Sequence, residues 1–246
     1  KILDKYLKKA PIELYLMCSF ALHTGARLQT VCTLKKQHIL DLKRNSKINS
    51  NDNTYSISVG GKIDTKDRAK YSLRLPVRVG EKLWNYVHSE EWMARAELSF
   101  YGVSASNYVF LSRYGNPFYT SRAEKVLRKN DESLDKKYSL QTGGAVRELL
   151  RKLQNVMKIN NEEIRYFSFH DFRATFGLNM LRNLLKHNCA PDQAMLYLKQ
   201  RMGHKDVETT HLYMQYAGYE ELSLDTNQAF ENMLYEDIDL SNEGGI

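Results

Sequence analysis

The last part of the chain holds histidines and tyrosines whose spacing could support nucleophilic chemistry. The stretch RMGHKDVETTHLYMQYAGY (201–219) carries His204, His211, Tyr213, Tyr216 and Tyr219. A tyrosine oxygen becomes a nucleophile when a nearby base accepts its proton. Tyrosines are equally common in packed helices, so these residues alone do not select one of the three.

Two earlier segments place arginine and histidine near each other or next to a helix end. FHDFRATFGLNML (169–181) carries His170 and Arg173, which lie three residues apart and so share one helical face. LHTGARLQTVCTL (22–34) carries Arg27 two residues after Gly25, the glycine that ends the preceding segment. Each feature alone is weak evidence for a functional site, because arginine is usually a surface residue.

Net charge points to a polyanionic partner. The chain of 246 residues has a formal charge of +7, but residues 220–246 contain eight acidic side chains and no Lys or Arg. Residues 1–219 therefore carry a net charge of +15. A body this basic favours a nucleic acid as partner, although a solvated basic surface has the same composition.

The four motifs occur in one order: TGxR, HxxR, GH, and then TTxxY, whose tyrosine lies nine residues after the histidine of GH. In that order and spacing they resemble the tyrosine recombinase (phage integrase) family over about residues 10–217. VFLSRYGNPF (109–118) also looks like the strand and turn that precede the family's DNA-facing helix.

The resemblance implies a role for each motif residue. Tyr213 is the nucleophile that forms a 3′-phosphotyrosine and leaves a free 5′-hydroxyl. Arg27 and Arg173 would clamp the non-bridging phosphate oxygens, since planar guanidinium groups match them. His170 is the candidate general base or hydrogen-bond partner of the tyrosine, and His204 would donate to a phosphate oxygen.

The family also uses a lysine from a β-hairpin to protonate the leaving 5′-oxygen. The hairpin GGKIDTKDRAK (60–70) offers Lys62, Lys66 and Lys70. The pattern TKDRAKYSLRLP favours Lys66, with Lys62 in reserve. A solvated lysine loop is the alternative for any one of them.

The helix expected at 120–129 (TSRAEKVLRK) could enter the major groove of double-stranded DNA. Arg122 would read a base edge and Lys125 would contact a phosphate; a solvent-exposed helix is the alternative. One departure from the family is Thr30, where RxxE commonly has a carboxylate. No zinc, nucleotide or flavin motif occurs, so we expect no metal and no cofactor.

Periodicity predicts a mainly α fold with a small antiparallel β-sheet (α+β), that is, the DNA breaking-rejoining catalytic fold. Three strands are expected at 38–43, 54–59 and 71–77. Helices are expected at 10–25, 80–98, 120–129, 143–158, 171–186 and 191–201.

The domain organisation follows from the resemblance and the charge pattern. We expect a catalytic domain at 1–219, with the family's N-terminal core-binding domain absent from this chain. The acidic C-terminal tail, 220–246, has Phe230, Met233 and Leu234 at helical spacing. In recombinases such a segment docks on a neighbouring subunit.

These features predict a site-specific DNA recombinase that assembles on DNA, as a tetramer in the full synapse. A type IB topoisomerase shares the constellation, and a non-catalytic DNA-binding module is the second alternative; the tail favours the recombinase. No apolar run approaches the ~18 residues of a membrane span. Three widely spaced cysteines suit a reducing cytoplasm.

Overall fold

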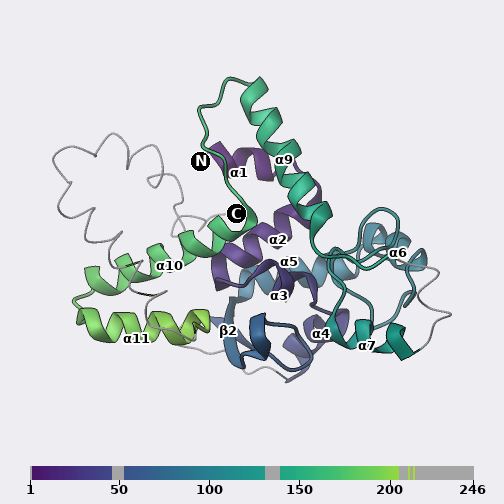
Figure 1. Ribbon diagram of the computed structural model, residues 1–246, viewed down its shortest axis with the longest axis horizontal. Coiled ribbons are helices and arrows are strands. Elements are labelled where there is room, and N and C mark those ends of the chain that lie inside the picture. The colour runs from purple at the N-terminus through teal and green to yellow at the C-terminus, as the bar shows by residue number, and fades with distance from the viewer. Residues whose placement is uncertain (1, 46–52, 131–138, 205–209, 211–212, 214–246) are drawn as a thin grey trace.

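The computed structural model describes residues 2–45, 53–130, 139–204, 210 and 213, and these form a mainly helical fold with one small sheet (Figure 1). The helices are α1 (Ile2–Leu7), α2 (Ile12–Thr24), α3 (Leu28–Cys32), α4 (Lys36–Asn45), α5 (Val77–Val87), α6 (Glu90–Glu97), α7 (Arg122–Asn130), α9 (Gly144–Ile159), α10 (Phe169–Lys186) and α11 (Pro191–Met202), with a 3₁₀ turn η1 (Lys66–Arg68). Strands β1 (Thr54–Val59) and β2 (Tyr71–Pro76) pair antiparallel. The mainly α fold class is confirmed.

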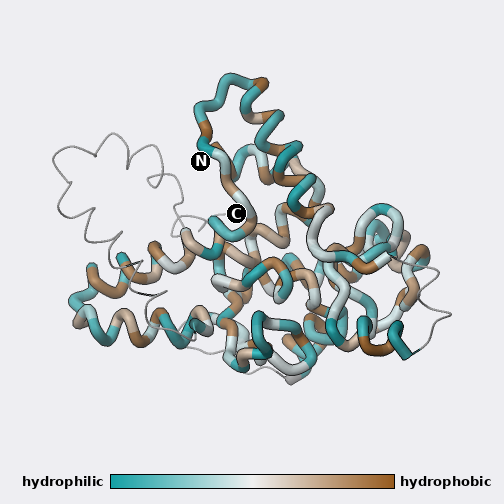
Figure 2. Tube along the Cα trace, in the orientation of Figure 1, coloured by the Kyte–Doolittle hydropathy of each residue, from teal (hydrophilic) through white to brown (hydrophobic). Residues whose placement is uncertain are grey.

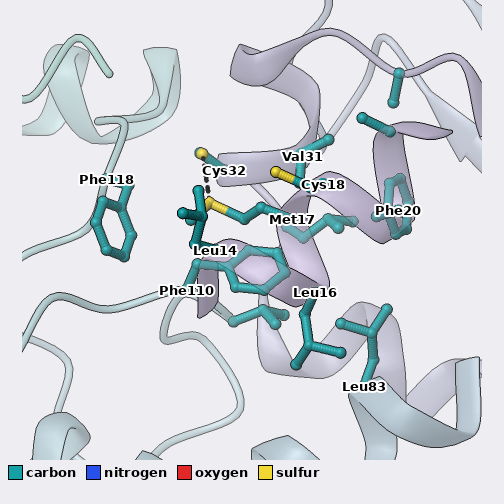
Figure 3. Packing of buried hydrophobic residues seen from close by; sticks show 14 of the residues in the cluster. Leu14, Leu16, Met17, Cys18, Phe20, Val31, Cys32, Leu83, Phe110 and Phe118 are labelled. Carbon is teal, nitrogen blue, oxygen red and sulfur yellow. Dashed lines mark hydrogen bonds between the residues drawn. The ribbon is translucent and has the colours of Figure 1, made fainter. Parts of the chain in front are cut away.

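Helix α2 forms the centre of the main core. Its apolar residues point in all directions, as expected for a helix enclosed by the protein: Leu14, Leu16, Met17, Cys18, Phe20 and Ala21 are all buried. Figure 3 shows them packed against residues such as Leu83 of α5 and Phe110. The helix ends where the sequence indicated, at Gly25, which adopts a left-handed φ of 68°.

The strand predicted at 38–43 is wrong, because this segment lies within α4. Its apparent alternation comes from Ile39 and Leu42, which are buried three residues apart on one helix face. Gln37 also donates to Asp41 across one helical turn at 2.7 Å. The sheet of the described chain therefore has two strands rather than three.

The single helix predicted over 80–98 is in fact two helices, α5 and α6. The chain breaks at Ser89, whose hydroxyl accepts a hydrogen bond from the Trp92 amide at 3.2 Å and caps α6. Helices α7, α9, α10 and α11 follow the predicted segments, with ends shifted by one or two residues.

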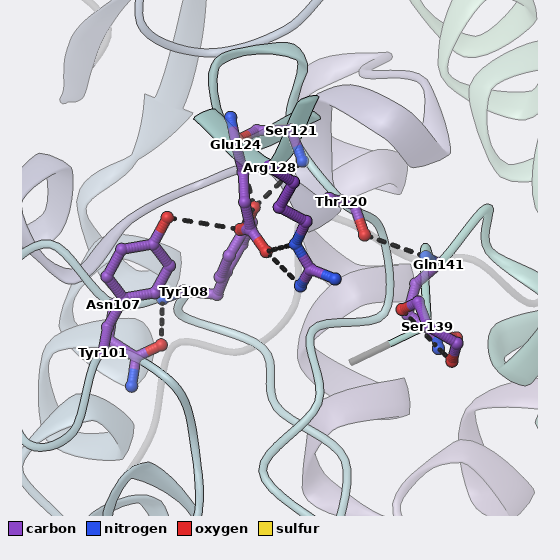
Figure 4. A network of polar contacts seen from close by, with 9 residues as sticks. All are labelled: Tyr101, Asn107, Tyr108, Thr120, Ser121, Glu124, Arg128, Ser139 and Gln141. Carbon is purple, nitrogen blue, oxygen red and sulfur yellow. Dashed lines mark hydrogen bonds and ion pairs between the residues drawn. The ribbon is translucent and has the colours of Figure 1, made fainter. Parts of the chain in front are cut away.

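Helix α7 is fixed to the body by a buried carboxylate. Glu124 pairs with Arg128 one turn later, with its Oε1 at 2.5 Å from Arg128 Nη2. The hydroxyl of Tyr108 donates to the other carboxylate oxygen at 2.5 Å, and Tyr101 donates at 3.4 Å (Figure 4). This network holds the Glu124 face of α7 inward.

Helices α10 and α11 lie side by side at one end of the molecule and enclose a second, smaller core (Figure 1). Apolar and polar residues are interspersed along both helices in Figure 2, which suits helices that pack on one face only. The buried residues of this core are Phe176, Leu181, Ala194, Leu198 and Met202, and Tyr213 packs against them.

The acidic tail expected at 220–246 lies outside the described residues, as do His211, Tyr216 and Tyr219. Across the ranges that the structure does describe, no helix combines the length and apolarity needed to span a bilayer.

Candidate active site

The first turn of α10 positions His170 and Arg173. Ser168 caps this helix through a reciprocal pair of bonds: its hydroxyl accepts from the His170 amide at 3.2 Å, and its own amide donates to Asp171 Oδ2 at 2.7 Å. The capped start fixes the rotation of the helix. As a result Arg173 points into the protein while His170 remains exposed.

Arg173 joins the two cores. It is 1% exposed, and its guanidinium donates to the backbone oxygens of Gly25 and Met202, the latter at 2.7 Å. Burial and, to a smaller extent, the charge of Arg27 lower the pKa of Arg173 to about 10, although nearby Tyr71 and Tyr213 act in the opposite direction. The guanidinium is still charged at neutral pH, with donors to spare for an anion.

Arg27 lies at the N-terminus of α3 and is half-buried. Its positive charge acts to lower the pKa of His170, Arg173, His204 and Tyr213, so Arg27 lies near all four. The structure therefore brings Arg27 and Arg173 together at the ends of two helices that are far apart in sequence.

His204 follows the left-handed Gly203 that ends α11 and is 8% exposed. Its Nδ1 lies 3.0 Å from the hydroxyl of the buried Thr210. Burial lowers the pKa of His204 to about 4, with further contributions from Arg173, Arg27 and His170. The ring is therefore neutral at pH 7, and the contact with Thr210 leaves Nε2 available for another group.

The ring of Tyr213 lies within this cluster. It stacks on His204 with ring centroids 6.0 Å apart and planes at 20°. It also packs so closely on Gly177 of α10 that a Cβ there would lie 2.6 Å from Tyr213 Cε1. Burial raises the pKa of Tyr213, and Arg173 and Arg27 oppose this rise. Both arginines thus face the hydroxyl that the sequence selected.

The three hairpin lysines differ in what they face. All are exposed, but the charge of Lys66 acts on the pKa of His170, whereas that of Lys62 acts on the pKa of His38 on α4. Lys70 lines a groove of about 720 Å³ together with residues of β2, α11 and His204. The arrangement therefore favours Lys66 over Lys62 as the lysine that protonates the leaving 5′-oxygen. Lys70 lies at the edge of the site.

Arg122 and Lys125 begin helix α7 as expected, but Arg122 has a partner within the chain. Its guanidinium donates to the backbone oxygen of Thr65, next to Lys66. Lys125 Nζ lies 5.5 Å from the centre of the Tyr119 ring. The base-reading role of Arg122 and the phosphate contact of Lys125 stay predictions.

Several contacts of the site were missed from the sequence. Thr210 binds His204, and its signal was the second threonine of TTxxY. Tyr71 lies beside Arg173 and packs on Gly203, where a Cβ would lie 2.6 Å from its ring; no motif marks it. Asp64, a buried carboxylate, reaches α3 by accepting from Gln29 Nε2 at 3.3 Å.

The position of the family's missing carboxylate is buried. Thr30 is 0% exposed, and its hydroxyl finds no hydrogen-bond partner in the part of the chain that the structure describes. The carboxylate of Asp64 contacts the same helix from the hairpin.

Taken together, two guanidinium groups, two imidazoles and one phenol lie close enough for their charges to act on one another's pKa. Guanidinium groups in a partly dehydrated site stabilise negative charge that develops on phosphate oxygens. Neutral imidazoles beside a phenol can accept its proton or donate to an oxygen. Among the described residues, no cluster of His, Cys, Asp or Glu has the arrangement of a metal site.

Three solved structures of recombinases resemble this chain in fold. A XerH site-specific recombinase bound to palindromic difH substrate, in a post-cleavage complex, has a TM-score of 0.52 at 14% identity and covers 90% of this chain and 50% of that one. A pre-cleavage complex of XerH with difH substrate has a TM-score of 0.52 at 13% identity, covering 91% and 50%. A XerA recombinase has a TM-score of 0.50 at 15% identity, covering 91% and 61%.

The chain thus spans about half the length of the XerH chains that it matches. At these identities the likeness shows the fold alone. No curated protein matches the chain in sequence. The model of the phage integrase family, however, matches residues 1–218. The chain therefore belongs to the phage integrase family.

Proposed function

We propose that residues 1–219 are the catalytic domain of a site-specific DNA recombinase that cleaves and rejoins strands through a 3′-phosphotyrosine. The observation that carries the proposal is the position of Tyr213, whose ring stacks on His204 and whose hydroxyl feels the charges of Arg173 and Arg27, which oppose the rise in its pKa that burial causes. A phenol beside two buried or half-buried guanidinium groups suits attack on a phosphodiester.

In the proposed reaction the scissile phosphate enters the space between the arginines. Arg27 and Arg173 bind its two non-bridging oxygens, and the free Nε2 of neutral His204 donates to one of them. Negative charge on these oxygens rises as attack proceeds, so the fixed donors bind the transition state more tightly than the substrate.

Tyr213 Oη then forms a bond to phosphorus while the bond from phosphorus to the 5′-oxygen breaks. The phenol proton passes to His170, and the proton that the leaving 5′-oxygen needs comes from Lys66. The products are a 3′-phosphotyrosine and a 5′-hydroxyl. Rejoining reverses these steps with the 5′-hydroxyl of another strand as nucleophile, so no bond energy is lost and no cofactor is required.

The partner in this proposal is double-stranded DNA, bound through the basic body, with Arg122 and Lys125 of α7 among the contacts. The chain would assemble on DNA, as a tetramer in the complete synapse, and act in the cytoplasm. The acidic tail at 220–246 would dock on a neighbouring subunit, with Phe230, Met233 and Leu234 as its apolar stripe. Deleting 224–246 should then leave binding to one site intact and weaken assembly.

A covalent-trapping experiment tests the proposal. Bound sites are first selected from a random-sequence duplex library, and nicked suicide duplexes are then made from them. We expect a covalent protein–DNA adduct whose phosphotyrosine maps to Tyr213. A chain that binds the selected sites without forming an adduct would be a DNA-binding module, and relaxation of a supercoiled plasmid lacking the site would instead indicate a topoisomerase.

A further inference from the structure

Lys66 has an exposed side chain, yet the three residues before it belong to the core. Ile63 is 1% exposed, Asp64 is 6% exposed and Thr65 is 0% exposed. Thr65 also closes the turn that follows, since its hydroxyl donates to the Ala69 oxygen at 2.7 Å. The hairpin is therefore fixed to the body immediately before its candidate acid.

Asp64 attaches the hairpin to two separate helices, α3 and α7. Its backbone amide donates to Thr33 Oγ1 at 3.1 Å, directly after α3. Its Oδ2 accepts from Gln29 Nε2 at 3.3 Å and from the backbone amide of Arg122, the first residue of α7, at 2.8 Å. A carboxylate at the N-terminus of a helix is further stabilised by the helix dipole.

Arg122 contacts both residues that precede Lys66. Its backbone amide binds the Asp64 carboxylate, and its guanidinium donates to the Thr65 oxygen. Helix α7 cannot shift easily to loosen these contacts, because the buried pair of Glu124 and Arg128 holds it inward. Asp64 and Arg122 thus lock the backbone on the N-terminal side of Lys66 against α3 and α7.

We propose that Asp64 and Arg122 are positioning residues, which hold the hairpin so that Lys66 meets the leaving 5′-oxygen. The inference rests on the proposed function, in which Lys66 is the general acid. An exposed lysine on a loose loop would sample many positions, and misplacing a catalytic group by about 1 Å can cost up to ~100-fold in rate. Anchoring the backbone fixes the point from which this exposed side chain extends.

The test compares two nicked suicide substrates, one with the natural 5′-bridging oxygen and one with sulfur at that position. A sulfur leaving group needs no proton, so its departure does not depend on Lys66. We expect Asp64→Asn and Arg122→Ala each to slow cleavage of the oxygen substrate by about 10- to 100-fold. With protein in saturating excess over DNA, so that any loss of DNA binding by Arg122→Ala does not enter the rate, both variants should cleave the sulfur substrate at nearly the wild-type rate.

Three comparisons make the result specific. Lys66→Ala should show the same rescue by sulfur, and adding Asp64→Asn to Lys66→Ala should cause no further loss on the oxygen substrate. Glu97→Gln removes an equal charge from an exposed residue of α6, outside the hairpin, and should leave both rates unchanged. Thermal unfolding of each variant checks that the chain is folded.

The failures are distinguishable. If sulfur rescues Lys66→Ala but not Asp64→Asn or Arg122→Ala, the positioning role is refuted while Lys66 remains the acid. Wild-type rates for both variants on the oxygen substrate would also refute it. Absence of rescue in Lys66→Ala would overturn both the acid assignment and the inference. A change in preferred DNA sequence for Arg122→Ala, with equal loss on both substrates, would make Arg122 a base-reading residue instead.

Discussion

Substitutions of Arg27 and Arg173 can separate an effect on the cleavage rate from an effect on stability. Both arginines lie at the candidate site, but only Arg173 also makes buried hydrogen bonds to the backbone. Arg173 is 1% exposed and donates to the backbone oxygens of Gly25 and Met202. Arg27 is half-buried at the start of α3. We expect Arg173→Ala and Arg27→Ala to slow cleavage alike and to differ in stability.

The stability difference follows from the two carbonyl groups that Arg173→Ala leaves unpaired. A buried acceptor without its donor costs about 1–3 kcal/mol, so the pair costs at most about 6 kcal/mol. Arg173→Ala also removes a buried charge, and this offsets part of the cost. The pKa of Arg173 is lowered to about 10, which corresponds to a cost of about 3 kcal/mol for keeping the guanidinium charged in the folded protein. The net loss from these two terms is therefore at most about 3 kcal/mol, which lowers Tm by at most roughly 6–12 °C for a chain of this size.

Arg27 makes no buried hydrogen bond of this kind with the residues that the structure describes, so the effect of Arg27→Ala on stability should stay within about 0.5 kcal/mol. Thermal unfolding measures Tm, and single-turnover cleavage of a nicked suicide substrate, well below both transitions, measures the rate. Both variants should lose at least the ~10²–10³-fold typical of one transition-state donor. Arg151→Ala, at a surface arginine paired with Glu148, controls for loss of charge.

Two results would refute this reasoning. A wild-type Tm for Arg173→Ala would mean that its contacts to Gly25 and Met202 do not support the fold. A wild-type cleavage rate for either variant would remove that arginine from the phosphate clamp.

Three further predictions concern Tyr213 and the histidines. Tyr213→Phe should abolish the covalent adduct and retain DNA binding, whereas Tyr216→Phe should still form it; the reverse pattern in gel analysis would reassign the nucleophile. A mixture of Arg27→Ala and Tyr213→Phe should form no adduct beyond that of each alone, because Tyr213 packs in the site of its own chain; restored cleavage would indicate attack on a phosphate bound by another subunit. Burial lowers the pKa of His204 and of His38 from 6.5 to about 4, so stability should fall as pH drops from about 6.5 to about 4. His204→Gln and His38→Gln should each weaken that dependence in denaturant titrations, but only His204→Gln should slow cleavage.

The sequence predicted the elements whose local signals are strong. Gly25 marked the end of α2, and the alternating residues of 54–59 and 71–76 form the observed pair of strands. The same alternation misled at 38–43, because Ile39 and Leu42 suit either a strand or a helix when the run is short. The single helix predicted over 80–98 is too long, because Ser89 caps the start of a second helix within that range.

The motifs of the site were visible in the sequence through their order and spacing, so Arg27, His170, Arg173, His204 and Tyr213 could be named before their contacts were known. What brings them together was not visible. The bond from Arg173 to the Gly25 oxygen joins residues 148 positions apart. Likewise, Asp64 and Arg122 meet only in the folded chain, and an isolated aspartate in a polar loop carries no local signal.

The electrostatics of the site bear on how the tyrosine is activated. Burial raises the pKa of Tyr213 above 10 in spite of Arg173 and Arg27, so at pH 7 fewer than about one molecule in a thousand holds the phenolate. A bound phosphate adds negative charge next to the hydroxyl and disfavours the phenolate further. Tyr213 should therefore attack as a neutral phenol that loses its proton during the reaction.

A base that is already neutral must then accept this proton. Burial, Arg173 and Arg27 lower the pKa of His170 below 6.5, so its ring is unprotonated at pH 7 and faces the same arginines as Tyr213. Single-turnover cleavage should rise with pH only until His170 has lost its proton, below pH 6.5, and stay flat from pH 7 to pH 9. His170→Gln should remove the rise at low pH and lower the plateau. A rate that keeps increasing about tenfold per pH unit between pH 7 and pH 9 would instead mean that a preformed phenolate is the attacking species, and His170 would then have no role as base.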